Sequence, residues 1–292
     1  MRLEQLPIGA RVLEPDSGLV FVVADRVNGH YPGVTMVTER ITTVACFDAA
    51  EPERSCAYPW DGYDRFGCNS YRNSNIHQWL NSAEERWYSP AHPLDTAPEA
   101  ERTRYGEQPN AARSGFLCRF SKAFRSALLE VDVPALERTG KDQGELTTVK
   151  AKLFLPSRTE IIKGDESGFA EGAPLPLFYD PDRVHRIQPT EEDMARYGRS
   201  WNPAREDAPF DAPQIYDPKF SWWYYLRTPS LRYGFLVRVM SAYGAVSYTY
   251  ANNDVVGIRP LCCLDPKLEV ELYQPMRATD QGVQHRLYRI TV

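Results

Sequence analysis

The stretch "GFLVRVMSAYGAVSYTYANNDVVGIRPLCCL" (residues 234–264) predicts three consecutive β-strands. Its segments "GFLVRVMS", "AVSYTYA" and "VGIRPLCCL" are rich in β-branched and aromatic residues. Tyr243-Gly244 and "ANND" supply turn residues between them. The middle strand carries tyrosine and serine where a core strand would carry valine or leucine. This composition is typical of a strand that presents one side to a ligand.

Upstream of this stretch, "GLVFVVADRV" (18–27) and "GVTMVTERIT" (33–42) predict two strands joined by a hairpin at "NGHYPG". Residues 70–89 predict a helix that Ser74 caps and that buries Trp79 and Leu80. "SKAFRSALLEV" (121–131) predicts a second amphipathic helix, and "KAKLFLPSRTEI" (150–161) a strand that ends at Pro156.

Composition and charge exclude several classes of protein. The chain has 292 residues, 42% of them hydrophobic, and a formal net charge of -5, which gives no general attraction for nucleic acid or anionic membranes. No apolar run approaches the roughly 20 residues that span a bilayer. The first residues lack a signal-peptide pattern. We therefore expect a cytoplasmic protein as synthesised, and display on a virion or cell surface would need another route.

Residues 163–218 are rich in Pro, Gly and Asp and predict an ordered, irregular excursion. Aromatic residues are concentrated between residues 216 and 250, from the end of this excursion onward. They are Tyr216, Phe220, Trp222, Trp223, Tyr224, Tyr225, Tyr233, Phe235, Tyr243, Tyr248 and Tyr250. This concentration has two possible explanations: the aromatic residues form a ligand-binding surface, or they pack beneath the excursion. Trp222 and Trp223 are expected in the core.

The sequence contains no recognisable catalytic motif, and we expect neither a metal nor a cofactor. The five histidines are isolated from one another, and the phosphate-binding and nucleophile-elbow patterns are absent. Asp180, Asp182 and His185 are close in sequence, but Pro181 favours a turn over a metal site. The six cysteines show no metal-ligand spacing. Cys262 and Cys263 are expected to be inert buried thiols on opposite faces of a strand.

Four segments in order resemble a family of uncharacterised bacterial and phage domains. Their patterns are Y-x-x-S-x-I-R-x-W-L-N, F-L-L-S-x-x-E, W-x-L-R-S-P and G-V-R-P-A. The corresponding segments here are "YRNSNIHQWLN" (71–81, with His77 in place of the arginine), "LFLPSRTE" (153–160), "WYYLRTP" (223–229) and "GIRPL" (257–261).

The resemblance implies an α+β, C-type-lectin-like fold, shared with formylglycine-generating enzymes and with variable proteins of diversity-generating retroelements. We expect one domain over 1–292, with N-terminal strands (1–60), core motifs (60–265) and a C-terminal extension (266–292). The fold is expected to contain short mixed or antiparallel sheets, two main helices and long irregular loops. It implies scaffold roles for Gly257, Arg259 and Pro260.

The resemblance to retroelement variable proteins is greatest near the C-terminal end. It implies a non-enzymatic binding protein whose partner is a protein or glycan on a cell or host surface, with its oligomeric state undetermined. Val237, Val239 and Val246 are expected to point inward. The expected ligand-contacting residues are Tyr224, Arg232, Tyr233, Phe235, Ser241, Tyr243, Ser247, Tyr248, Tyr250, Asn252, Asn253 and Asp254. The alternatives are an oxidase related to formylglycine-generating enzymes and a non-variable structural module of a phage.

Overall fold

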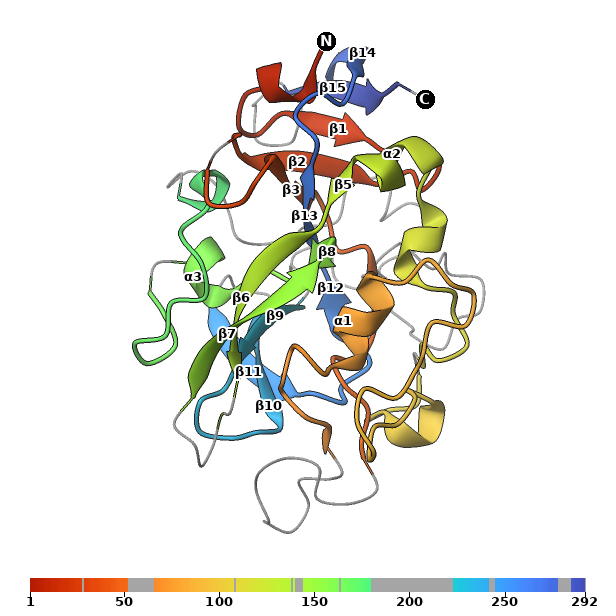
Figure 1. Cartoon of the computed structure of the whole chain (residues 1–292), viewed down its shortest axis with the longest axis vertical. Helices are drawn as coiled ribbons and strands as arrows, with labels where there is room; N and C mark the ends of the chain where they lie inside the picture. Colours follow the sequence, from red (N-terminus) through yellow and green to blue (C-terminus); the bar gives the residue numbers. More distant parts are fainter. Residues whose placement is uncertain are drawn as a thin grey trace.

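The computed structural model describes residues 1–27, 29–51, 66–107, 109–137, 139, 144–162, 164–179, 223–241, 245–277 and 285–291. Within these ranges the fold is α+β and is dominated by strands, as expected (Figure 1). Both ends of the chain lie at the same end of the molecule.

The larger sheet joins strands from both ends of the chain. The C-terminal segment forms a hairpin whose second strand pairs in parallel with the first strand of the chain. The expected N-terminal hairpin is confirmed, because its two strands pair antiparallel. In spatial order the sheet contains β14 (Val270–Arg277), β15 (His285–Ile290), β1 (Arg11–Leu13), β2 (Val20–Asp25), β3 (Val34–Thr38), β13 (Leu261–Leu264) and β5 (Leu128–Leu129), with β8 (Leu153–Phe154) also paired to β13.

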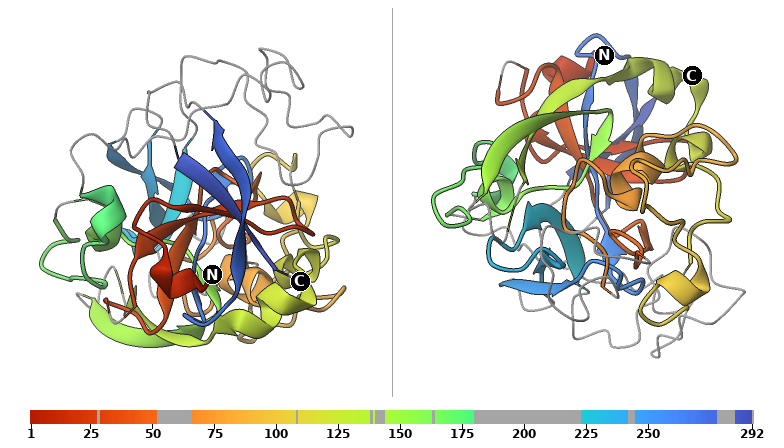
Figure 2. Two further views of the ribbon diagram at one scale, coloured as in Figure 1. Left: turned by 90° about the horizontal axis from the view of Figure 1, so that it is seen from above. Right: turned by 60° about the horizontal axis from the view of Figure 1, so that its bottom comes forward.

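The smaller sheet lies toward the end of the molecule opposite the termini (Figure 1, Figure 2). Its order is β11 (Val246–Tyr250), β10 (Leu236–Met240), β9 (Tyr224–Pro229), β12 (Gly257–Ile258) and β4 (Thr43–Val44). A separate antiparallel ribbon is formed by β6 (Val131–Glu137) and β7 (Glu145–Ala151).

The helices are short. Among the residues that the structure describes, they are α1 (Asn75–Leu80), α2 (Lys122–Ala127) and α3 (Arg158–Ile161), with 3₁₀ turns η1 (Leu3–Gln5), η3 (Ala100–Arg102), η4 (Phe116–Arg119) and η5 (Pro176–Phe178). Ser74 caps α1 by accepting a hydrogen bond from the His77 backbone, and Trp79 and Leu80 are fully buried, as expected. The helix expected over 70–89 is nevertheless only six residues long.

A side chain at its C-terminus explains where α1 ends. The Asn81 amide donates to Leu153 O, and its oxygen accepts hydrogen bonds from the backbone N–H groups of Lys152 and Leu153. This contact links the end of α1 to β8. The second helix is also shorter than expected, because the chain becomes strand β5 at Leu128.

The segment "VGIRPLCCL" joins the two sheets and is not one strand. Gly257 pairs in the smaller sheet, and a β-carbon there would lie 2.7 Å from Trp223 O, so only glycine allows this close approach. After the Arg259-Pro260 corner, β13 pairs in the larger sheet. The Arg259 guanidinium is buried and donates from Nε to Thr38 O (3.0 Å), a hydrogen bond that connects the corner to β3.

A fully buried ion pair lies where the motif segments meet. Arg227 of β9 makes a bidentate contact with Glu160 of α3, with Nη1–Oε2 at 2.7 Å and Nη2–Oε1 at 2.8 Å. Its guanidinium also donates to the backbone oxygens of Pro134, Leu155 and Glu171. Glu160 in turn accepts from the Ser157 backbone and closes a capping box at α3. One guanidinium therefore connects β6, β8, α3 and β9.

The Arg227–Glu160 pair generates a stability prediction. We expect Arg227→Met to lower the free energy of unfolding by about 3–5 kcal/mol, because Glu160 stays buried without its partner. The double variant Arg227→Met, Glu160→Met should not recover this loss, because three backbone carbonyls remain without a donor. Urea unfolding measures both variants.

The exposed pair Arg289–Glu271 provides the control, since its side chains are 46% and 47% exposed. Arg289→Met should cost at most about 1 kcal/mol. A double variant as stable as the wild type would show that the carbonyl contacts of Arg227 contribute nothing.

Candidate binding surface

One face of the β10–β11 hairpin is buried, and the other is exposed at Tyr248, although Leu236 and Met240 on that face are buried. Val237 and Val239 are fully buried, whereas Tyr248 is 57% exposed. The register pairs Val237 with Thr249, so Tyr248 and Tyr250 lie on the other face. Val246 shares this outer face because it precedes the tyrosines by two and four residues. Val237 and Val239 therefore point inward as expected, whereas Val246 lies on the opposite face of the ladder but is half-buried against the core.

Tyr250 is the centre of an aromatic stack. The Phe66 ring stacks on it at 4.2 Å between centroids, and the Arg104 guanidinium lies 4.3 Å from the same centroid. Two groups this close to one ring occupy opposite faces of it. Phe235 is stacked at 5.7 Å. The ring of Tyr250 is therefore fixed from several sides.

The stack continues outward in both directions along the surface. Tyr233 packs on Phe235 at 5.8 Å, and Arg232 lies over Tyr233 at 5.1 Å. On the other side, Arg104 also lies over Tyr105, which is 52% exposed. We call this set the aromatic–arginine surface: Arg104, Tyr105, Arg232, Tyr233, Phe235, Tyr248 and Tyr250.

Two buried residues of the "ANND" turn hold this surface in place. The Asp254 carboxylate accepts hydrogen bonds from the backbone N–H groups of Tyr105 (3.0 Å) and Glu107 (2.8 Å). The backbone of Asn252 donates to Phe66 O and accepts from Arg104 N–H. The same turn therefore positions Phe66 and Arg104, two of the three groups that pack on Tyr250.

Tyr225 supports the end of β11 from the core. It is fully buried, and its hydroxyl lies 2.8 Å from Tyr250 O and 2.9 Å from Asn253 O. Burial raises its pKa well above the usual range, so the hydroxyl remains a hydrogen-bond donor at neutral pH. The backbone that carries Tyr250 is thus fixed by the core.

The structure corrects several of the predicted contact residues. Tyr224, Ser241, Asn252 and Asp254 are buried, because they support the sheet and the turn and do not face solvent. Ser247 and Asn253 are half-buried. Arg232 and Tyr248 are exposed, Tyr233, Phe235 and Tyr250 are half-buried within the stack, and Tyr243 lies outside the described residues.

Three members of the stack were missed in the sequence. Phe66, Arg104 and Tyr105 come from segments far from the hairpin, and no periodic pattern connects them with it. Trp223 was expected in the core but is 38% exposed. Trp222 and the group Asp180, Asp182 and His185 lie outside the described residues.

A pocket of about 480 Å³ lies beside α1. Its lining includes His77, whose pKa burial lowers to about 4, so the imidazole is neutral at pH 7. Gln78 in the same wall bonds the backbone of Ser89 through both ends of its amide. The Asn81 amide is similarly used to hold β8. The side-chain amides of Gln78 and Asn81 therefore serve the fold.

The adjacent cysteines of β13 are buried, as expected. Burial raises the pKa of the Cys263 thiol to about 12 and that of Cys262 well above its usual range. Both are therefore protonated thiols at neutral pH, which is the unreactive form. Cys46 is also buried, and Cys56 lies outside the described residues.

The family of the chain is established by sequence comparison. The profile of a domain family of unknown function, DUF6273, matches residues 33–266, which is most of the chain. The chain therefore belongs to this family. Neither the curated proteins nor the solved structures gave a match. Within the described ranges, every helix is too short or too polar to cross a bilayer.

The role of Asp254 can be tested by Asp254→Asn. We expect the free energy of unfolding to fall by about 1–3 kcal/mol, because an amide nitrogen would face one of the two part-buried backbone N–H groups that the carboxylate accepts from. Urea unfolding measures this loss, and hydrogen exchange should rise at residues 104–107.

Asp132→Asn is the control, because Asp132 is exposed and should change stability by at most about 0.5 kcal/mol. Equal stability of the two variants would contradict a clamping role for Asp254.

Proposed function

We propose that this chain is a binding protein and that the aromatic–arginine surface contacts its ligand. The observation that carries this proposal is the stacking of Phe66, Arg104 and Phe235 on Tyr250 beside the exposed Tyr248. Tyrosine and arginine are enriched at the centres of binding interfaces. A protein or glycan on a cell or host surface is the proposed partner.

The rigidity of the surface supports this function. Ordering side chains at an interface costs roughly 0.5–1.5 kcal/mol for each rotamer-rich group. Here the rings are already held by stacking, and their backbone is fixed by Tyr225 and Asp254. Most of these side chains are therefore already ordered in the folded protein, and little further ordering is needed on binding.

The charge of the surface indicates what it can bind. Arg104 and Arg232 are exposed at its two ends, and Arg238 lies 5.9 Å from the Tyr248 ring while paired with Glu166. Exposed guanidinium groups beside aromatic faces favour carboxylate and other acidic groups. A ligand with acidic groups and apolar faces fits this arrangement.

For the fold, we propose the C-type-lectin-like class that the motif segments imply, and for the biological setting a variable target of a diversity-generating retroelement. The exposed positions, among them Arg232 and Tyr248, would vary, while the buried Tyr225 and Asp254 would remain. A near-copy of the codons for about residues 220–260 beside a reverse transcriptase gene would test this setting.

The binding proposal predicts a separation between affinity and stability. The chain is screened against a glycan array and a displayed peptide library, and Tyr248→Ala and Arg104→Ala are then measured against each ligand found. We expect at least a tenfold loss of affinity, with a change in unfolding free energy of at most about 0.5 kcal/mol for Tyr248→Ala.

The larger sheet offers matched controls, because Tyr273 is 44% exposed and Arg289 lies 5.2 Å from its ring. Tyr273→Ala and Arg289→Ala should bind like the wild type. The proposal would be contradicted if the control variants lost as much affinity as Tyr248→Ala and Arg104→Ala, or if neither screen found a ligand. Either result would favour a structural module.

A further inference from the structure

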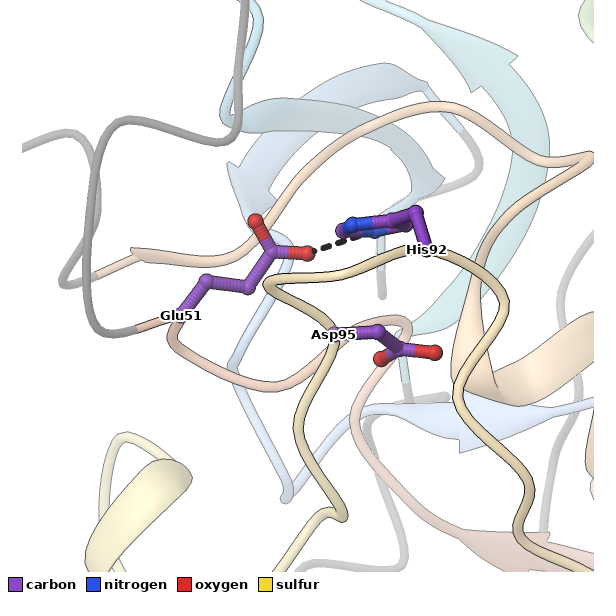
Figure 3. Close-up of side chains that lie close together, drawn as sticks. All are labelled: Glu51, His92 and Asp95. Atoms are coloured by element: carbon purple, nitrogen blue, oxygen red, sulfur yellow. Dashed lines mark ion pairs between the residues drawn. The ribbon is translucent and has the colours of Figure 1, made fainter.

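Glu51, His92 and Asp95 lie together outside the aromatic–arginine surface. One potential ligand atom from each residue lies within 4.8 Å of the other two. His92 Nε2 is 3.0 Å from Glu51 Oε1, and Figure 3 shows this carboxylate facing the imidazole, with Asp95 beside them. The sequence predicts no metal site here, because Glu51 is far from the other two residues along the chain.

A backbone turn brings His92 and Asp95 together, and hydrogen bonds from outside the group orient the Asp95 carboxylate. Asp95 N–H donates to His92 O, and this turn brings the two side chains to one place. The Asp95 carboxylate is oriented by the Ala91 backbone (2.7 Å) and by the Asn75 amide (3.1 Å). Such outer hydrogen bonds are typical of carboxylates that bind metals.

The segment that carries Glu51 is also fixed. The Ala49 backbone donates to the Asn75 side chain, and Ala50 bonds Arg102 through its N–H and Thr96 through its oxygen. The side chain of Glu51 is only 1% exposed, and that of His92 is 26% exposed. The group is therefore preorganised and is reached from the side of His92.

The surroundings of the group are rich in negative charge. Burial, followed by the carboxylates of Asp95, Asp48, Glu51 and Glu99, raises the pKa of Tyr88. Burial and the nearby Asp95 also raise the pKa of Asp48, against hydrogen bonds that lower it. Of these carboxylates, Asp48 and Glu51 are buried, and placing negative charges close together away from water costs free energy that a bound cation offsets.

We propose that Glu51, His92 and Asp95 bind a divalent transition-metal ion, with zinc as the best match. Imidazole nitrogen and carboxylate oxygen are both zinc ligands, and three protein ligands leave the fourth tetrahedral position open. Calcium and magnesium prefer oxygen ligands alone. Ligand atoms around tetrahedral zinc lie roughly 3.3 Å apart, so small side-chain rotations close the present arrangement.

The proposed ion has a structural consequence. Glu51 follows β4, whereas His92 and Asp95 belong to the loop that continues through η3 to Arg104 and Tyr105. A shared ion would bind this loop to the segment after β4. Metal binding would therefore stabilise the loop that carries one end of the aromatic–arginine surface, although the site itself does not depend on the proposed function.

The test is calorimetric titration of the tag-free chain with Zn²⁺ alone, followed by thermal unfolding with and without the ion. We expect one site per chain, a higher melting temperature with zinc, and much weaker binding of Ca²⁺ and Mg²⁺. His92→Gln and Asp95→Asn should each weaken zinc binding at least tenfold and remove the thermal shift. His92 is partly exposed, so its replacement leaves the fold intact even if Glu51→Gln does not fold.

His30→Gln is the matched control, because His30 is exposed and lies outside this group. It should bind zinc like the wild type. The proposal is overturned if the wild type binds no zinc, or if His92→Gln and His30→Gln bind it equally. Loss of zinc binding without loss of ligand binding would leave the proposed function standing, so the two proposals can fail separately.

Discussion

The buried contact between Arg227 and Glu160 is the constraint on which the rest of the fold depends. A guanidinium removed from water must find partners for all its donors, and here they come from β6, the end of β8, α3 and the backbone at Glu171. These segments therefore assemble together or leave a charge unsatisfied. The arrangement also determines where the smaller sheet lies, because Arg227 belongs to its strand β9.

Local signals in the sequence predicted much of the fold, but not its connections. The hairpin of β2 and β3, the Ser74 cap and the burial of Trp79 follow from short-range patterns. The early end of α1 does not, because it depends on Asn81 reaching β8. The division of "VGIRPLCCL" between two sheets and the parallel pairing of β15 with β1 depend on partners far away in the chain.

The candidate surface was predictable only in part for a related reason. Residue composition indicated that Tyr248 faces outward, and side-chain alternation supports that position. Composition cannot distinguish an exposed aspartate from a buried one. It therefore predicts Asp254 on the surface, whereas its carboxylate accepts hydrogen bonds from two backbone N–H groups. Arg104 carried no signal at all, because its role arises from the turn that brings it to Tyr250.

The residues that support the surface differ from those that are exposed on it, and this difference determines which positions can change. The residues that fix its backbone, Tyr225 and Asp254, are buried and use their polar atoms on main-chain groups. Exposed members such as Arg232 and Tyr248 contribute only side-chain contacts at the edge of the stack. Replacing an exposed side chain therefore alters the ligand-facing chemistry while the buried supports keep the backbone in place. A surface built in this way can accept new side chains without a new fold.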